Sequence, residues 1–158
     1  GSSGMDAADV NGDGRPDLIV SNGDGFNSAF AAPAPWHGLQ WLENQGDGRF
    51  AYHRVGDSLG CYSPVAADLR GRKDGHLDLV SVSAFNNSLN ASSIALTAWL
   101  NDGKENFTPV VLANQPTWMV TLAAGDLDGQ HRLGHGRGQG PGLVGGGRGQ
   151  ARHDLDGM

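Results

Sequence analysis

The sequence repeats itself at an interval of about 58 residues, and this period constrains the fold more than any other feature. Ala7-Ala8-Asp9 returns as Ala66-Ala67-Asp68 and again as Ala124-Gly125-Asp126, at offsets of 59 and 58 residues. Three further landmarks return in the same order: Asp17-Leu18-Ile19-Val20 as Asp78-Leu79-Val80-Ser81, Trp41-Leu42-Glu43-Asn44 as Trp99-Leu100-Asn101, and Gly46-Asp47-Gly48-Arg49-Phe50 as Asp102-Gly103-Lys104-Glu105-Asn106-Phe107. A shared period predicts repeated units that pack on one another.

Each period contains four short segments with the composition of β-strands, bounded by Gly, Asn and Asp. They are Asp17–Asn22, Leu39–Asn44, Phe50–Gly56 and Ser63–Ala67 in the first period, and Leu77–Ala84, Ala95–Asn101, Phe107–Ala113 and Trp118–Ala124 in the second. No stretch shows a sustained 3.6-residue periodicity, which excludes a helical solenoid. The pattern predicts an all-β protein of four-stranded antiparallel β-propeller blades, two complete and a third begun.

The loop that precedes the first of these segments has the spacing of a calcium-binding loop. Side-chain oxygens stand at loop positions one, three, five and nine, which are Asp9, Asn11, Asp13 and Asp17. The main-chain carbonyl of Arg15 stands at position seven. Calcium takes six to eight oxygen ligands of these kinds. Position twelve is Val20 rather than the Glu of an EF-hand, so the loop leads into a strand. The alternative is a polar turn without a metal.

The later copies of the loop depart from this pattern. The second contains Asp68, Asp74 and Asp78, but it is two residues longer and has Arg70 where Asn or Asp is expected. We expect weak metal binding or none there, with Lys73 or Arg72 replacing part of the ion's charge. The third begins with Asp126 and Asp128 and then loses the pattern at Gln130.

The combined pattern, Asp-x-Asn-x-Asp-Gly-x-x-Asp-Leu followed by Trp-Leu-x-Asn-x-Gly-x-Gly-x-Phe, resembles the FG-GAP or VCBS-type repeat. The resemblance covers residues 6 to about 129. These repeats form the calcium-loop blades of integrin α-subunit-like propellers. The resemblance therefore implies a calcium-stabilised propeller module located outside the cell, at the cell surface or in the periplasm, and used in cell adhesion or carbohydrate binding.

The repeats suggest a division of the chain. Residues 1–5 look like a cloning scar, 6–67 form the first blade, 68–125 the second, and 126–158 a truncated third repeat with a disordered Gly/Arg-rich tail. Because propellers close with roughly four to eight blades, we expect an incomplete ring. The chain is then a fragment, a shared ring or an open array, and self-association through blade faces is expected.

Composition narrows the function further. The formal net charge is −6, and no basic stripe with interleaved aromatic residues indicates nucleic acid binding. No window approaches 18 apolar residues, so no membrane span is expected. The single cysteine, Cys61, cannot form an internal disulfide and is expected to be a small buried residue.

Two sets of side chains remain to be placed. Trp41, Trp99, Phe50 and Phe107 are expected in the core. Trp36, His37 and Asn27 lie in an inserted segment between two strands, where a glycan or protein ligand could bind. The alternative is that Trp36 covers the neighbouring blade or subunit. Asn86, Asn90 and Asn106 each begin an Asn-x-Ser/Thr triplet, the acceptor for a glycan in a secretory pathway.

No catalytic motif is present, so we expect a non-catalytic binding module. Two alternatives remain open. The chain could be a structural assembly module that forms a shared ring or filament, or an accessory fragment of a secreted propeller enzyme, a lyase or an oxidoreductase.

Overall fold

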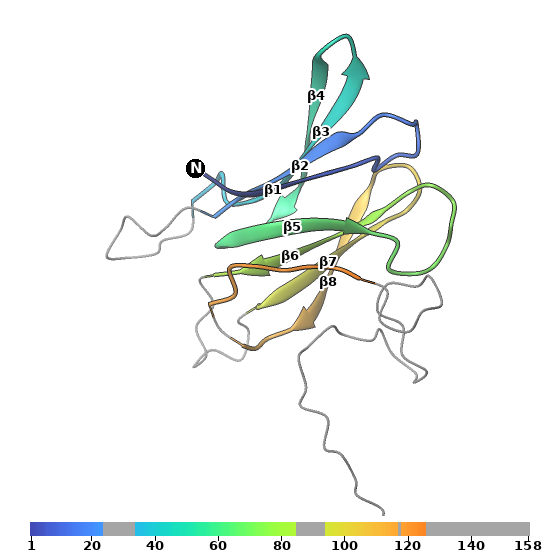
Figure 1. The fold of residues 1–158 in the computed structure, drawn as a ribbon. Coiled ribbons are helices and arrows are strands. Elements are labelled where there is room, and N and C mark those ends of the chain that lie inside the picture. The colour runs from blue at the N-terminus through green and yellow to red at the C-terminus, as the bar shows by residue number, and fades with distance from the viewer. Residues whose placement is uncertain (24–33, 85–93, 117, 126–158) are drawn as a thin grey trace, which may run out of the picture.

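The computed structural model describes residues 1–23, 34–84, 94–116 and 118–125. Within these ranges the protein is all-β and contains no helix (Figure 1). The strands are β1 (Ser2–Ala8), β2 (Asp17–Asn22), β3 (Gly38–Gly46), β4 (Arg49–Asp57), β5 (Cys61–Ala67), β6 (Asp78–Ser83), β7 (Leu96–Asn101) and β8 (Phe107–Ala113). They form two antiparallel four-stranded sheets, β1-β2-β3-β4 (the first sheet) and β5-β6-β7-β8 (the second sheet), which do not close into a ring.

The strands are grouped differently from the sequence-based division. Ser63–Ala67 was expected to end the first blade, but it lies in β5 and pairs with β6. Residues 2–5, set aside as a scar, are part of β1 and pair with β2. The reason is that each acidic loop joins antiparallel neighbours, so the strand before the loop pairs with the strand after it. Residues 118–125, expected to contain a strand, have no regular strand structure.

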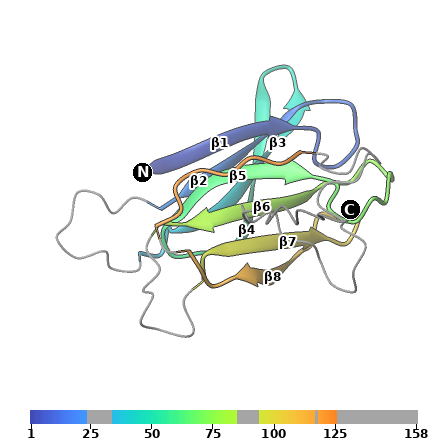
Figure 2. The ribbon, with the colours of Figure 1, turned by 60° about the horizontal axis from the view of Figure 1, so that its bottom comes forward.

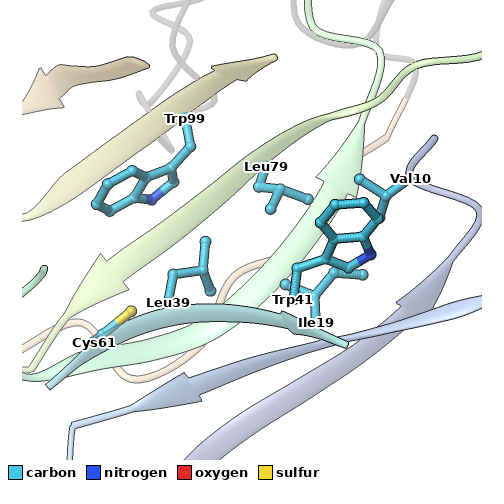
Figure 3. Close-up of a cluster of buried hydrophobic side chains, with 7 residues drawn as sticks. All are labelled: Val10, Ile19, Leu39, Trp41, Cys61, Leu79 and Trp99. Carbon is cyan, nitrogen blue, oxygen red and sulfur yellow. The ribbon is translucent and has the colours of Figure 1, made fainter. Parts of the chain in front are cut away.

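The two sheets pack face to face around one apolar core (Figure 3). Its members come from both sheets and from the first loop: Val10, Ile19, Leu39, Trp41, Cys61, Leu79 and Trp99. Burial alternates along β2, with every second residue buried, whereas all six residues of β6 are buried. Thus β6 is covered on both faces and β2 on one.

The chain stacks its units at an offset of 58 to 60 residues. Ser3 Oγ on β1 donates a hydrogen bond to the carbonyl oxygen of Cys61, 58 residues later. The Leu122 main-chain N–H donates to Ser63 Oγ at 2.9 Å, and these residues are 59 apart. Residues 119–125 therefore pack on β5 in the same way that β5 packs on β1. Figure 2 shows this arrangement. Met119 and Leu122 pack on the far face of the second sheet.

Trp41 and Trp99 are both buried, with 2% of the surface of each exposed, which confirms their place in the core. They are not equivalent, however. Trp41 pairs with Ile19 and faces the second sheet, whereas Trp99 pairs with Leu79 and faces the first. The two copies of the strand differ by one residue, and such a shift moves a side chain to the opposite face. Trp99 fits because it packs on Gly56, where a Cβ would lie 2.2 Å from the indole ring.

Phe107 and Phe50 show the consequence of this stacking. Phe107 is partly buried and meets the edge of Trp41 on the first sheet, with ring centroids 6.4 Å apart at an interplanar angle of 72°. Phe50 was expected to be equally buried, but this is wrong, since it is 46% exposed. It lies on the face of the first sheet that points away from the second sheet.

Candidate metal-binding loops

The first loop folds around its own acidic side chains. The carboxylate of Asp9 accepts three main-chain hydrogen bonds, from the N–H groups of Gly12 (2.9 Å), Asp13 (3.0 Å) and Gly14 (2.8 Å). Asn11 Oδ1 accepts from the Asp13 N–H at 3.2 Å. Gly14 has φ of +85°, which only glycine adopts without strain. These bonds hold the loop tightly curled, with its three oxygen-bearing side chains on one short turn.

The fourth side chain of the predicted set lies deeper. Asp17 is the first residue of β2 and is fully buried. Its Oδ2 accepts from the Val10 N–H at 3.0 Å, and its Oδ1 accepts from the Asn44 N–H at 2.8 Å. A buried carboxylate needs such partners, because burial of an unpaired charge is costly. Asp17 thereby fixes both the start of the loop and the turn between β3 and β4.

Asn44, which sequence reasoning did not assign to the site, completes this arrangement. Its Nδ2 donates to the Pro16 carbonyl oxygen at 2.9 Å, and its Oδ1 accepts from the Gly46 N–H at 3.0 Å. Asn101 repeats these bonds in the second sheet, donating to the Leu77 carbonyl at 3.1 Å and accepting from the Gly103 N–H at 2.9 Å. The signal was present in the sequence, since both asparagines end the repeated Trp-Leu motif.

The position of Arg15 also differs from that predicted for a cation site. Arg15 was expected to contribute its carbonyl, and its guanidinium contacts Asp13 Oδ2 and donates from Nε to the Asn44 carbonyl at 2.6 Å. Within the described ranges, no group of three or more acidic, histidine or cysteine side chains converges as a metal site would require. The oxygens of Asp9, Asn11 and Asp13 nevertheless belong to the hard-donor class that calcium selects.

The second loop is organised around arginine. Arg70 binds the buried Asp78 bidentately, through Nε to Oδ2 at 3.1 Å and Nη2 to Oδ1 at 2.6 Å. Arg72 Nη2 lies 3.6 Å from Asp78 Oδ1, and Arg72 Nη1 lies 3.4 Å from Asp74 Oδ2. The expectation that Arg72 or Lys73 replaces part of an ion's charge therefore omitted the main participant, Arg70. Lys73 contributes a main-chain N–H, which donates to Asp68 Oδ2 at 2.9 Å.

The Asp68 carboxylate organises the second loop as Asp9 organises the first. Burial raises the pKa of Asp68, but the main-chain N–H groups of Lys73 and Arg72 and the charge of Arg72 outweigh it. The pKa of Asp68 therefore lies below its ordinary value. Its bonds stabilise the fold above the pKa of the unfolded chain and are lost as the pH falls through the lowered value.

Asp126 and Asp128, predicted for the third loop, lie outside the described residues.

The two loops touch each other. The Leu77 N–H donates to the Val10 carbonyl oxygen at 3.0 Å. A Cβ on Gly12 would lie 3.0 Å from the carbonyl oxygen of Gly75, so the glycine-containing turns are close-packed. Val10 thus links Asp17 in the first loop to the residue just before β6.

The predicted ligand-binding residues are only partly brought together. Trp36 is 54% exposed, whereas His37 is buried, and their rings meet edge to face at a centroid distance of 6.3 Å. Asn27 lies outside the described residues. Beside His37 is a hollow of about 360 Å³, lined by Ala34, Pro35, His37, Asp57, Ser58 and Leu59. His37 is therefore the one member of the predicted trio shown to line it.

The remaining candidates are the single cysteine and the asparagines of the Asn-x-Ser/Thr triplets. Cys61 is buried, as expected, and burial raises the pKa of its thiol to about 11 against weaker opposing hydrogen bonds, so it stays protonated at neutral pH. Asn106 Nδ2 donates to Asp102 Oδ2 at 2.9 Å in the turn before β8. Asn86 and Asn90 lie outside the described residues.

No protein-family model matches the chain, and no curated protein or solved structure is significantly similar to it. In the part of the chain that the structure describes, no helix has the length and apolar character needed to cross a bilayer.

Substitution of Asp17 by Ala should destabilise the fold strongly. The change leaves the buried N–H groups of Val10 and Asn44 without their acceptor, at a cost of about 1–3 kcal/mol for each group. We expect a large fall in the urea midpoint, measured by tryptophan fluorescence in calcium-free buffer. Asp47→Asn is the control, because the Asp47 side chain is 89% exposed. Equal midpoints for Asp17→Ala and the parent protein would show that these bonds do not stabilise the fold.

Proposed function

We propose that this protein is a calcium-binding, non-catalytic recognition module made of β-propeller-type blades. Two observations support the blade architecture. The hydrogen bonds of Asn44 recur at Asn101, and successive units stack at offsets of 58 to 60 residues. Contact between the first strands of neighbouring sheets fits the radial repetition of propeller blades.

The charge of the first loop is the observation that carries the calcium proposal. Residues 9–17 contain three carboxylates and one arginine, a formal charge of −2, which one divalent cation would neutralise. Asp9, Asn11, Asp13 and Asp17 would hold the ion with the carbonyl of Arg15. Calcium supplies a compact charge that neutralises the carboxylates and binds several oxygens at once. The loop would then be stabilised by ion binding, in place of a disulfide that a single cysteine cannot form.

The recognition surface proposed here is the region of Trp36 and His37. The exposed indole of Trp36 contacts His37, which lines a hollow together with Asp57 and Ser58. An aromatic ring with acidic and hydroxyl side chains nearby suits the apolar face and the hydroxyl groups of a sugar. Arg54 links two residues that line the hollow, because its Nη2 donates to Asp57 Oδ1 at 2.6 Å and to the His37 carbonyl oxygen. A glycan, or a protein that carries one, is the ligand class that fits, and an extracellular, surface or periplasmic location would accompany it.

Removal of calcium should lower the thermal stability of the protein. In a chelator we expect Tm to fall by several degrees relative to millimolar calcium, because loop carboxylates then repel one another without the ion. Asp13→Ala should abolish this calcium response, and isothermal titration calorimetry should show the loss of a calcium site. Asp57→Asn, outside the loops, should keep the response. A melting curve of the parent protein that does not change with chelator would contradict the proposal.

Substitution of Trp36 by Ala should remove glycan binding without affecting the fold. We expect the signal on a glycan array to fall at least tenfold, since stacking on an aromatic ring supplies much of the binding energy in such sites. Trp118→Ala is the matched control, because Trp118 is similarly exposed, at 61%, and lies elsewhere. If both variants bind glycans equally well, Trp36 is not part of the recognition surface.

A second candidate function, assembly, is favoured by the free face of the first sheet. Met5, Phe50 and Tyr52 lie on this face and are 65%, 46% and 62% exposed. The corresponding face of the second sheet, with Trp99 and Phe107, is covered by the first sheet. We propose that a second copy of the chain covers the free face in the same way, which would extend the stack of sheets.

Charged substitutions on the free face should separate such assemblies. In multi-angle light scattering, the parent protein should show a concentration-dependent mass above that of one chain, and Phe50→Glu with Tyr52→Glu should give single chains. Val111→Glu is the control, because Val111 is 48% exposed on β8 of the second sheet. A parent protein that is a single chain at all concentrations would exclude this candidate function.

A further inference from the structure

The second loop differs from the first in charge as well as in length. Residues 68–78 contain three aspartates, but also Arg70, Arg72 and Lys73, so their formal charge is zero with histidine neutral. The corresponding residues of the first loop carry −2. The charges of the three aspartates in the second loop are therefore balanced by three cationic side chains of the same loop.

The guanidinium of Arg70 lies at the centre of this loop. Besides its two bonds to Asp78, Nη2 donates to the Asn101 carbonyl oxygen. Asp78 is fully buried, and the Arg70 side chain is 37% exposed, so the cation closes the loop from the solvent side. Arg72 adds bonds to the carbonyl oxygens of Asn101 and His76, both at 2.9 Å.

Comparison with the first loop identifies what Arg70 replaces. In both loops, Oδ1 of the buried aspartate accepts a main-chain N–H from the equivalent asparagine, at 2.8 Å from Asn44 and 2.9 Å from Asn101. The other oxygen of Asp17 accepts from the main chain of Val10, whereas the other oxygen of Asp78 accepts from Arg70 Nε. A guanidinium therefore takes a position in the second network that the main chain holds in the first.

We propose that the second loop binds no metal ion and that Arg70 serves as its permanent cation. The guanidinium neutralises Asp78, bonds to both of its oxygens and ties the loop to the end of β7 through Asn101. A planar guanidinium presents N–H donors from two nitrogens side by side, which matches the two oxygens of a carboxylate, whereas an ammonium group is a point charge without this fork. The second loop is thus held against the end of β7 whether or not calcium is present, and only the first loop responds to the ion.

The stability test compares Arg70→Ala, Arg70→Met and Arg70→Lys in calcium-free buffer. Arg70→Met keeps an apolar stem and removes the charge, so it separates charge from packing. We expect Ala and Met to lower Tm by roughly 5–10 °C, because each leaves the buried Asp78 with fewer partners, and Lys to lower it by less. Arg49→Ala is the control, because the Arg49 side chain is 71% exposed and bonds only loosely to Asp47. An Arg70→Met variant as stable as the parent protein would overturn the proposal.

The metal test uses Asp13→Ala, in which the first loop is disabled. Titration with calcium chloride should then show no binding that depends on the second loop. Calcium binding by Asp13→Ala that a further Asp74→Ala substitution abolishes would overturn the proposal. The stability test does not depend on calcium in the first loop. If the parent protein binds no calcium at all, the proposed function fails, and the Arg70 variants still decide the role of Arg70.

Discussion

A buried carboxylate at the start of the second strand of each sheet is the constraint on which the rest of the structure depends. Asp17 and Asp78 are both fully buried. A buried carboxylate is tolerated only when it is fully bonded, and this requirement brings distant parts of the chain together. The acidic loop must curl back to it, and the following hairpin must present the main chain of an asparagine. One buried charge thus fixes the geometry of a loop, a strand start and a turn.

The protein satisfies this constraint in two ways. In the first sheet the Asp17 oxygens accept main-chain hydrogen bonds, and the neighbouring loop keeps an excess of negative charge. In the second sheet a guanidinium approaches the same carboxylate and the loop is neutral. Two copies of one repeated sequence pattern therefore keep the same arrangement around the buried aspartate although the charges of their loops differ. The difference rests on the loop residues that follow the first aspartate.

Much of the fold could be predicted from the sequence, because the repeat and the strand composition are strong local signals. The all-β class, the two antiparallel sheets and the burial of Trp41 and Trp99 were predicted in this way. The grouping of strands was not, because Ser63–Ala67 has the same composition whichever sheet it joins. The faces of Trp41 and Trp99 were not predicted either, because a difference of one residue between two copies of a strand is invisible in the spacing of landmarks. Phe50 was misplaced because burial depends on which neighbour covers a face.

The candidate site was predicted less completely. The spacing of Asp9, Asn11, Asp13 and Asp17 identified the first loop, since a curled loop needs alternate polar side chains. Asn44 was missed because it is 27 residues from Asp17 and only the paired strands bring them together. The role of Arg70 depends on the direction of one long side chain. Spacing indicates that a cation is near the loop, but not which of three neighbouring cations reaches the buried oxygen.

The bond between Leu77 and Val10 has a consequence for how the molecule moves. Val10 donates to Asp17 on one side, accepts from Leu77 on the other, and places its side chain in the shared core. Opening of the first loop must break a contact of the second, so neither can fray by itself. The two loops therefore belong to one cooperative unit, and local fluctuations at this end of the molecule are coupled across the boundary between the sheets.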